Sequence, residues 1–171
     1  MHIYLTGFMG AGKTTVGRCL ANDLGWDFLD LDDLIERHSS MTISEIFEHQ
    51  GEPEFRQMEK LALCQISRAE SVVIATGGGI MVDAKNRSLM NERGVTVWLN
   101  VSFRVIESRM HASDLQSRPL YKDTSQAKEL FEKRTATFEL CGFRVDVSPQ
   151  LTAQEVANSV CKLLREAECD I

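Results

Sequence analysis

The chain has 171 residues, 43% of them hydrophobic, which suits one domain over residues 1–171 with a single core. Its net charge of −6 argues against a broad nucleic-acid or anionic-membrane surface but allows a local basic pocket. The five scattered cysteines form no CxxC pair, which is typical of a reducing compartment. No segment approaches the ~20 apolar residues of a membrane span, so we expect a cytoplasmic protein that binds neither membrane nor nucleic acid.

The chain begins with an apolar stretch, residues 3–6, followed by GFMGAGKT at 7–14, which fits GxxxxGK[ST] at every fixed position. The stretch is typical of a buried parallel strand, and a helix from Lys13 to Leu24 would direct its positive dipole end at bound phosphates. Lys13 is expected to reach the β and γ phosphates, and Thr14 to hold Mg²⁺. A plain glycine-rich turn is the alternative. The predicted nucleotide-binding residues of this loop are Gly10, Ala11, Gly12, Lys13, Thr14 and Thr15.

A second, shorter apolar stretch ends in the acidic run 30–33, and the next helix is expected from about Leu34. Ligands of open α/β sheets bind at the carboxyl ends of strands, where residues two apart point to the same side. We therefore predict that Asp30 supports Mg²⁺ through a water molecule and that Asp32 faces the hydroxyl group of a phosphate acceptor. The alternative is that these acids cap the next helix, which suits Asp33 well.

Residues of about 32–62 are expected to form substrate-binding helices. A capping-box pattern starts a short helix at Ile43, Gly51 breaks it, and a longer helix follows with Arg56 on its flank. On spacing alone, the surface interpretation is favoured over the binding one for Arg56, and the same holds for Arg134 later in the chain. The predicted apolar stripe of the longer helix consists of Phe55, Met58, Leu61, Ala62 and Ile66.

The apolar run 71–76 is typical of a central parallel strand and leads into Gly77, Gly78 and Gly79, where three glycines imply close backbone approach. A helix at 83–92, a strand at 95–99 and a helix from 102 to about 110 are expected after it.

Helical periodicity then disappears over 111–124, and a loop of this length is usually a lid or a disordered segment. Arg118 lies in this predicted lid beside a proline, where closure would bring its guanidinium over the transferring phosphoryl group. A solvated loop arginine is the alternative interpretation.

The last part of the chain predicts a helix at 127–138 that carries Arg134, a strand at 143–147 and a final helix after a capping box at Thr152. Five strands thus alternate with helices. This order predicts an α/β fold, a three-layer α/β/α sandwich with a central five-stranded parallel sheet and ligands above the carboxyl ends of the strands.

Several absences narrow the class of phosphate-binding protein. The guanine-reading NKxD motif is missing, and no aspartate is followed three residues later by glycine, which argues against a switch GTPase. An acidic protein that recognises a small anion needs a few well-placed arginine forks, and Arg56 and Arg134 are the candidates. Phosphoryl transfer to an alcohol is the chemistry that these residue types favour.

The chain resembles the shikimate kinases over nearly its full length. The resemblance rests on GFMGAGKTT, DLD at 30–32, the segment TISEIFEHQGEPEFRQME, TGGG ending at Gly79, Arg118-Pro119-Leu120 and Lys133-Arg134. It implies a P-loop kinase with a lid that transfers the γ-phosphate of ATP to the 3-hydroxyl of shikimate, with Mg²⁺, in aromatic amino-acid biosynthesis.

The resemblance also implies residue roles. Asp32 would bind the substrate hydroxyls and serve as the base, and Arg56 and Arg134 would clamp the carboxylate. The substrate ring would pass close to Gly78 and Gly79. Arg118 would touch the phosphates from the lid. The loop before the last helix lacks the basic residues that the family often has there, and Arg109 at the base of the lid is our candidate for an adenine stack instead.

Two other functions remain open from the sequence. A gluconate-type small-metabolite kinase shares the loop and the sheet, and a nucleotide-binding module without turnover would keep Lys13 but need no acidic pair. The partners that we expect are ATP and shikimate, bound by a monomer.

Overall fold

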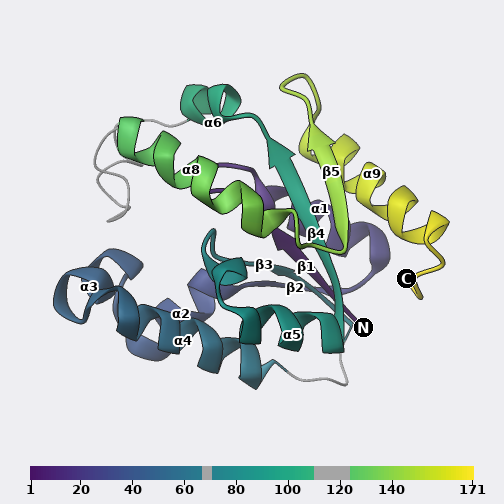
Figure 1. The fold of residues 1–171 in the computed structure, drawn as a ribbon. Coiled ribbons are helices and arrows are strands. Elements are labelled where there is room, and N and C mark those ends of the chain that lie inside the picture. Colours follow the sequence, from purple (N-terminus) through teal and green to yellow (C-terminus); the bar gives the residue numbers. More distant parts are fainter. Residues whose placement is uncertain (67–70, 110–123) are drawn as a thin grey trace.

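The computed structural model describes residues 1–66, 71–109 and 124–171. Its five strands form one parallel sheet in the order β2-β3-β1-β4-β5, and helices lie on both faces, which confirms the predicted α/β sandwich (Figure 1). The strands are β1 (His2–Thr6), β2 (Asp27–Asp30), β3 (Val72–Ala75), β4 (Gly94–Val101) and β5 (Phe143–Val147).

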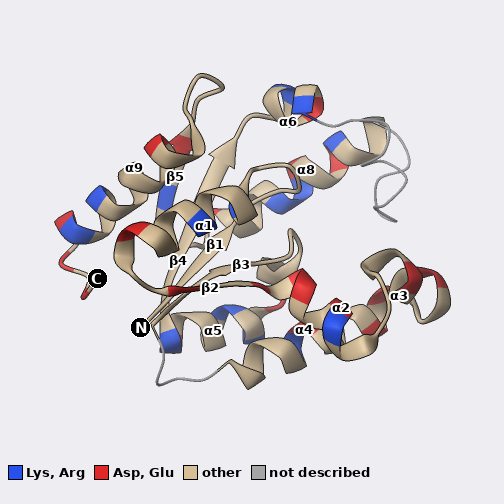
Figure 2. Ribbon diagram, turned by 180° about the vertical axis from the view of Figure 1, so that it is seen from behind, with Lys and Arg blue, Asp and Glu red and all other residues tan. Residues whose placement is uncertain are grey.

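Helices α1 and α9 cover one face of the sheet, and α5 and α8 cover the other (Figure 1). Helices α2, α3 and α4 gather beside the β2 edge, and acidic residues mark the ends of β2 and the start of α2 (Figure 2). The helices are α1 (Lys13–Leu24), α2 (Leu31–Ser39), α3 (Ile43–His49), α4 (Gly51–Gln65), the 3-10 helix η1 (Ile80–Val82), α5 (Ala84–Arg93), α6 (Phe103–Arg109), α8 (Thr124–Phe138) and α9 (Ala153–Glu166). In the part of the chain that the structure describes, no helix combines the length and hydrophobicity needed to cross a membrane.

The sheet register brings three loops to one edge. Strands β1 and β3 are buried throughout because helices cover both of their faces. They are apolar except for His2 and Thr6, the buried polar residues at the two ends of β1. Leu5 pairs with Ala75 in β3 and with Val97 in β4, and Asp30 of β2 also pairs with Ala75. The loop after β1, the acidic run after β2 and the glycine turn after β3 therefore begin at the same level.

Local signals place several helix ends where the sequence predicts them. Both predicted capping boxes are present, with Thr42 and Glu45 at the start of α3 and Thr152 and Glu155 at the start of α9. Helix α2 is different, because it begins at Leu31, before the predicted position. The Asp30 side chain accepts a hydrogen bond from the backbone N–H of Asp32 and so caps the helix three residues earlier.

The predicted apolar stripe of α4 is partly wrong. Leu61 is 61% exposed, whereas Glu59 and Leu63 lie on the buried face with Phe55 and Ala62. The buried positions follow the i, i+4, i+7, i+8 pattern from residue 55, so residue 61 points away from the core. The face that holds the site therefore includes a carboxylate that an apolar stripe does not predict.

Candidate active site

The loop between β1 and α1 has the backbone of a phosphate cradle. Gly10 and Gly12 have φ angles of +76° and +90°, the left-handed region that glycine adopts without strain. The Lys13 ammonium folds back over the loop and donates hydrogen bonds to the carbonyl oxygens of Gly7 at 2.9 Å and Phe8 at 3.0 Å. A cation and the amino-terminal end of α1 thus lie together at the predicted phosphate site.

Thr14 and Asp30 form a hydroxyl–carboxylate pair beside this loop. The Thr14 hydroxyl donates a hydrogen bond to Asp30 Oδ2 at 2.7 Å, and Asp30 Oδ1 accepts the N–H of Asp32 at 3.1 Å. The prediction that Asp30 and Asp32 share one side of a strand end is wrong, because Asp32 lies in the first turn of α2. Both carboxylates nevertheless line the same two cavities, because the capped helix turns Asp32 toward them.

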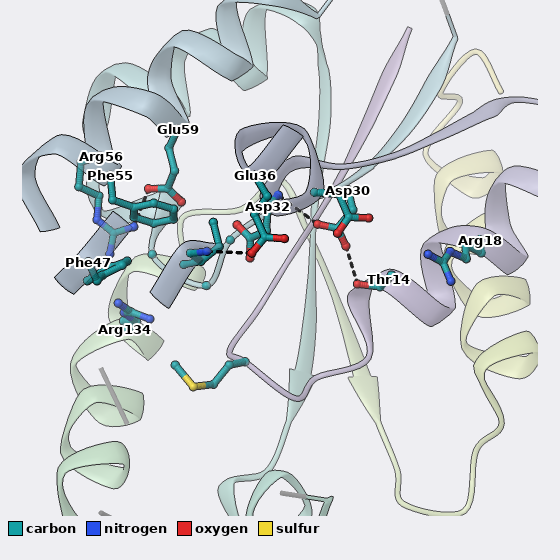
Figure 3. A pocket seen from close by; sticks show the side chains of 16 residues that line it. Thr14, Arg18, Asp30, Asp32, Glu36, Phe47, Phe55, Arg56, Glu59 and Arg134 are labelled. Carbon is teal, nitrogen blue, oxygen red and sulfur yellow. Dashed lines mark hydrogen bonds and ion pairs between the residues drawn. The ribbon is translucent and has the colours of Figure 1, made fainter. Parts of the chain in front are cut away.

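The first cavity, of about 410 Å³, lies between α2, α3, α4, the glycine turn and α8. Arg56 from α4 and Arg134 from α8 are directed to one side of it, with Asp32 and Asp30 farther along (Figure 3). Phe47 and Phe55 add an aromatic wall, with ring centroids 4.8 Å apart. The cavity brings together the five predicted substrate-binding residues Asp32, Arg56, Gly78, Gly79 and Arg134.

The second cavity, of about 480 Å³, contains the predicted nucleotide-binding residues of the loop, 10–15. Arg109 at the end of α6 also lines it, as do apolar residues that include Leu151 and Val156. The two cavities are continuous in their lining: both include Met9, Thr14, Asp30, Asp32 and Gly78. A donor bound in the second cavity and an acceptor bound in the first would therefore meet at the acidic pair.

The two arginines differ in their ionic partners. Arg56 donates to Glu59 at 2.5 Å and to Glu52 at 2.7 Å, and although burial alone lowers its pKa, these carboxylates outweigh that effect and raise it. Arg134 is only 6% exposed and has no ion pair with a carboxylate of the described residues. Burial, reinforced by the positive charge of Arg56, lowers the pKa of Arg134 to about 10. An anionic ligand between the two guanidinium groups would relieve this repulsion.

Glu59 is a residue of the site that the sequence analysis missed. Its side chain is fully buried, and burial raises the pKa of its carboxyl to about 7, against the opposing effect of Arg56. A signal was present in the sequence: Glu59 stands four residues after Phe55 and three after Arg56, so it falls on the buried face of α4 and within reach of the arginine.

The glycine turn after β3 packs against these charged groups. A Cβ at position 77 would lie 2.6 Å from Glu59 Oε1, and one at position 79 would lie 2.6 Å from Arg56 Nη2. Any side chain at either position would displace a group that lines the cavity. At positions 77 and 79 the close approach that the glycines imply is thus to side chains of the site, and at position 78 it includes the backbone of Gly7 and Met9.

Arg118 and most of the predicted lid at 111–124 lie outside the described residues. The role expected for Arg118 therefore stays a prediction.

A parallel sheet with a GxxxxGK[ST] loop after its central strand, and two cavities joined at an acidic pair, place the protein among the P-loop kinases. The family model for shikimate kinase matches residues 9–165 of this chain. A shikimate kinase of Sulfurihydrogenibium sp. is 39% identical to it over 96% of this chain and 98% of the relative's length. The chain belongs to the shikimate kinase family.

Solved structures agree with this assignment. Shikimate kinase from Acinetobacter baumannii in complex with shikimate has a TM-score of 0.91 and 35% identity, covering 98% of this chain and 94% of its own. The enzyme from Aquifex aeolicus has a TM-score of 0.85 and 34% identity, covering 98% of both chains. A gluconokinase from Sinorhizobium meliloti, at 17% identity and a TM-score of 0.59, shares the fold alone.

Proposed function

We propose that this protein transfers the γ-phosphate of ATP to the 3-hydroxyl of shikimate, giving shikimate 3-phosphate and ADP for aromatic amino-acid biosynthesis. The observation that carries the proposal is the pair Arg56 and Arg134 in a cavity that meets the nucleotide cavity at Asp32. Two guanidinium groups suit a carboxylate, and a carboxylic acid with ring hydroxyls is the kind of acceptor that the first cavity would hold.

The donor half would bind ATP through the loop. Backbone N–H groups of residues 10–15 and the amino-terminal end of α1 would hold the phosphates, and Lys13 would leave its carbonyl partners to reach the β and γ phosphates. Arg109 would contact the adenine from the end of α6, and Arg118, through the resemblance to the family, would reach the phosphates from the lid.

Mg²⁺ fits the residues at the start of α1. The hydroxyl of Thr14 and the carboxylate of Asp30, 2.7 Å apart, are hard oxygen donors of the type that Mg²⁺ prefers, together with substrate phosphates and water. Thr14 would bind the ion directly and Asp30 through a water molecule. The bound ion would neutralise charge on the β and γ phosphates.

The acceptor half would orient the hydroxyl for in-line attack. Arg56 and Arg134 would hold the carboxylate, while the ring would pass the backbone of Gly78 and Gly79. Asp32 would accept a hydrogen bond from the 3-hydroxyl, orient it toward the γ-phosphate and accept its proton as the phosphoryl group transfers. Positioning by the two arginines would supply much of the rate enhancement.

The proposal extends to the oligomeric state of the protein and its cellular compartment. We propose a monomer, since each half of the site is built from one chain. All five cysteines are free thiols, which fits a reducing compartment such as the cytoplasm.

A coupled ADP-release assay tests the proposed function with shikimate, gluconate and nucleoside monophosphates as acceptors. We expect turnover with shikimate and none above background with the others. Turnover with gluconate but not shikimate would overturn the acceptor assignment, and ATP binding without turnover of any acceptor would indicate a module that only binds nucleotide.

A further inference from the structure

The two carboxylate oxygens of Glu59 have different surroundings. Oε2 accepts a hydrogen bond from Arg56 Nη1 at 2.5 Å, whereas Oε1 is buried and has no hydrogen-bond partner among the described residues. Oε1 faces the backbone of Gly77, since a Cβ there would lie 2.6 Å from it. Burying a carboxylate oxygen without a hydrogen-bond partner costs much more free energy when the group is charged than when it is protonated.

Charged groups from three helices surround Glu59. Arg56 and Glu52 lie on its own helix α4, Asp32 faces it from α2, and Arg134 faces it from α8. Asp32 Oδ1 would lie 3.1 Å from the same Cβ position on Gly77 as Glu59 Oε1 does, so both carboxylates border one turn. With every group ionised, three carboxylates oppose two guanidinium groups, and the cluster carries one net negative charge.

An anionic substrate adds to this negative charge. This step rests on the proposed function, in which the shikimate carboxylate lies between Arg56 and Arg134. Its negative charge would offset the positive charge of both guanidinium groups, which stabilises the ionised form of Glu59. We propose that binding of the substrate carboxylate is coupled to uptake of one proton from solvent by Glu59, which converts its carboxylate to a neutral carboxyl at Oε1. Glu59 is then a positioning residue whose protonation state follows occupancy of the cavity.

The protonation state of Glu59 changes near neutral pH. Because burial raises the pKa of Glu59 to about 7, the free enzyme holds this proton only in part at physiological pH, and the bound anion raises the pKa further. The complex therefore binds more protons than the free enzyme, and affinity for shikimate falls as pH rises above about 7. Each pKa unit gained on binding weakens Kd about tenfold between the low-pH and high-pH limits.

Calorimetric titration of the wild-type enzyme with shikimate tests this coupling directly. Titrations at one pH slightly above 7, in buffers with different ionisation enthalpies, give the number of protons taken up per ligand. We expect uptake on the order of half a proton and, in titrations repeated at higher pH, a weaker Kd. Shikimate bound tightly with heat that is independent of the buffer would overturn the coupling while leaving the proposed function intact, whereas a wild type that binds no shikimate would overturn both.

Two matched variants locate the proton. Glu59→Gln cannot take it up and should bind shikimate with no buffer-dependent heat, whereas Glu52→Gln removes the more exposed partner of Arg56 and should retain the uptake. Unchanged uptake in Glu59→Gln would refute the assignment to this residue. If that variant does not bind, infrared difference spectra of the wild type decide: a protonated-carboxyl band gained on binding supports the coupling, and its absence refutes it.

Discussion

Replacing Gly79 with alanine should weaken the binding of shikimate and leave the binding of ATP unchanged. In Gly79→Ala the new Cβ would lie 2.6, 2.7 and 2.8 Å from Nη2, Nη1 and Cζ of Arg56, where ordinary contact begins at 3.4 Å. The guanidinium is held by Glu52 and Glu59 and would have to move by roughly 1 Å, out of the geometry of a bidentate ion pair. The backbone at residue 79 has φ −114°, which alanine adopts freely, so the fold should survive.

The size of this effect follows from the contact that the shift removes. One hydrogen bond between charged groups contributes about 1.5–3 kcal/mol, so the KM for shikimate should rise by about 10- to 150-fold while the KM for ATP stays within about twofold of the wild type. Initial rates with each substrate varied and the other saturating measure both constants. Gly142→Ala is a matched control, since its Cβ would lie 3.7 Å from the nearest atom. An unchanged KM for shikimate in Gly79→Ala would refute the placement of Arg56 in the acceptor cavity.

Three further changes test other parts of the site. Asp32→Asn should lower kcat by about 10²- to 10⁴-fold with an unchanged circular dichroism spectrum, because the acceptor proton loses its base. Lys13→Ala should weaken ATP binding measured by calorimetry, because the loop loses its cation. Because burial raises the pKa of Glu59 from 4.5 to about 7, the folded state binds more protons than the unfolded state in this interval. The free energy of unfolding should therefore fall by ~3 kcal/mol as pH rises from 4.5 through 7, a fall that denaturant titrations should not find in Glu59→Gln.

Each of these predictions has a clear contrary result. Full activity of Asp32→Asn would remove Asp32 as the base, and undiminished ATP affinity of Lys13→Ala would contradict the phosphate cradle. The same pH dependence of unfolding in wild type and Glu59→Gln would show that the Glu59 carboxyl does not carry the raised pKa.

The sequence predicted the strand, loop and helix of the proposed donor half correctly because their signals are local. An apolar run, glycines at fixed spacing and Lys13 with Thr14 at a helix start lie within a dozen residues, and the strand and helix form where that pattern indicates. The two capping boxes behave in the same way, because each is a contact between residues three apart.

The acceptor half was harder to predict because longer-range packing decides it. Asp30 proved to be both a partner of Thr14 and a helix cap, so Asp32 reaches the cavity from α2 and not from a strand. The spacing from Phe55 and Arg56 puts Glu59 on the inner face of α4, but its complete burial depends on the packing of that helix against the site. The near-complete burial of Arg134 depends on α8 closing over the glycine turn, a contact across more than 50 residues of sequence that no local pattern encodes.

The central claim, that Arg56 binds the carboxylate of the acceptor, is tested most directly by a cycle that removes each partner in turn. Values of kcat/KM are measured for shikimate and for its uncharged methyl ester, with wild type and with Arg56→Ala. If the two groups interact, the wild type should have a much lower kcat/KM for the ester than for shikimate. The ratio of the two values should be smaller by about tenfold or more in Arg56→Ala. An equal loss with both enzymes would contradict the claim, because the carboxylate and Arg56 would then act independently.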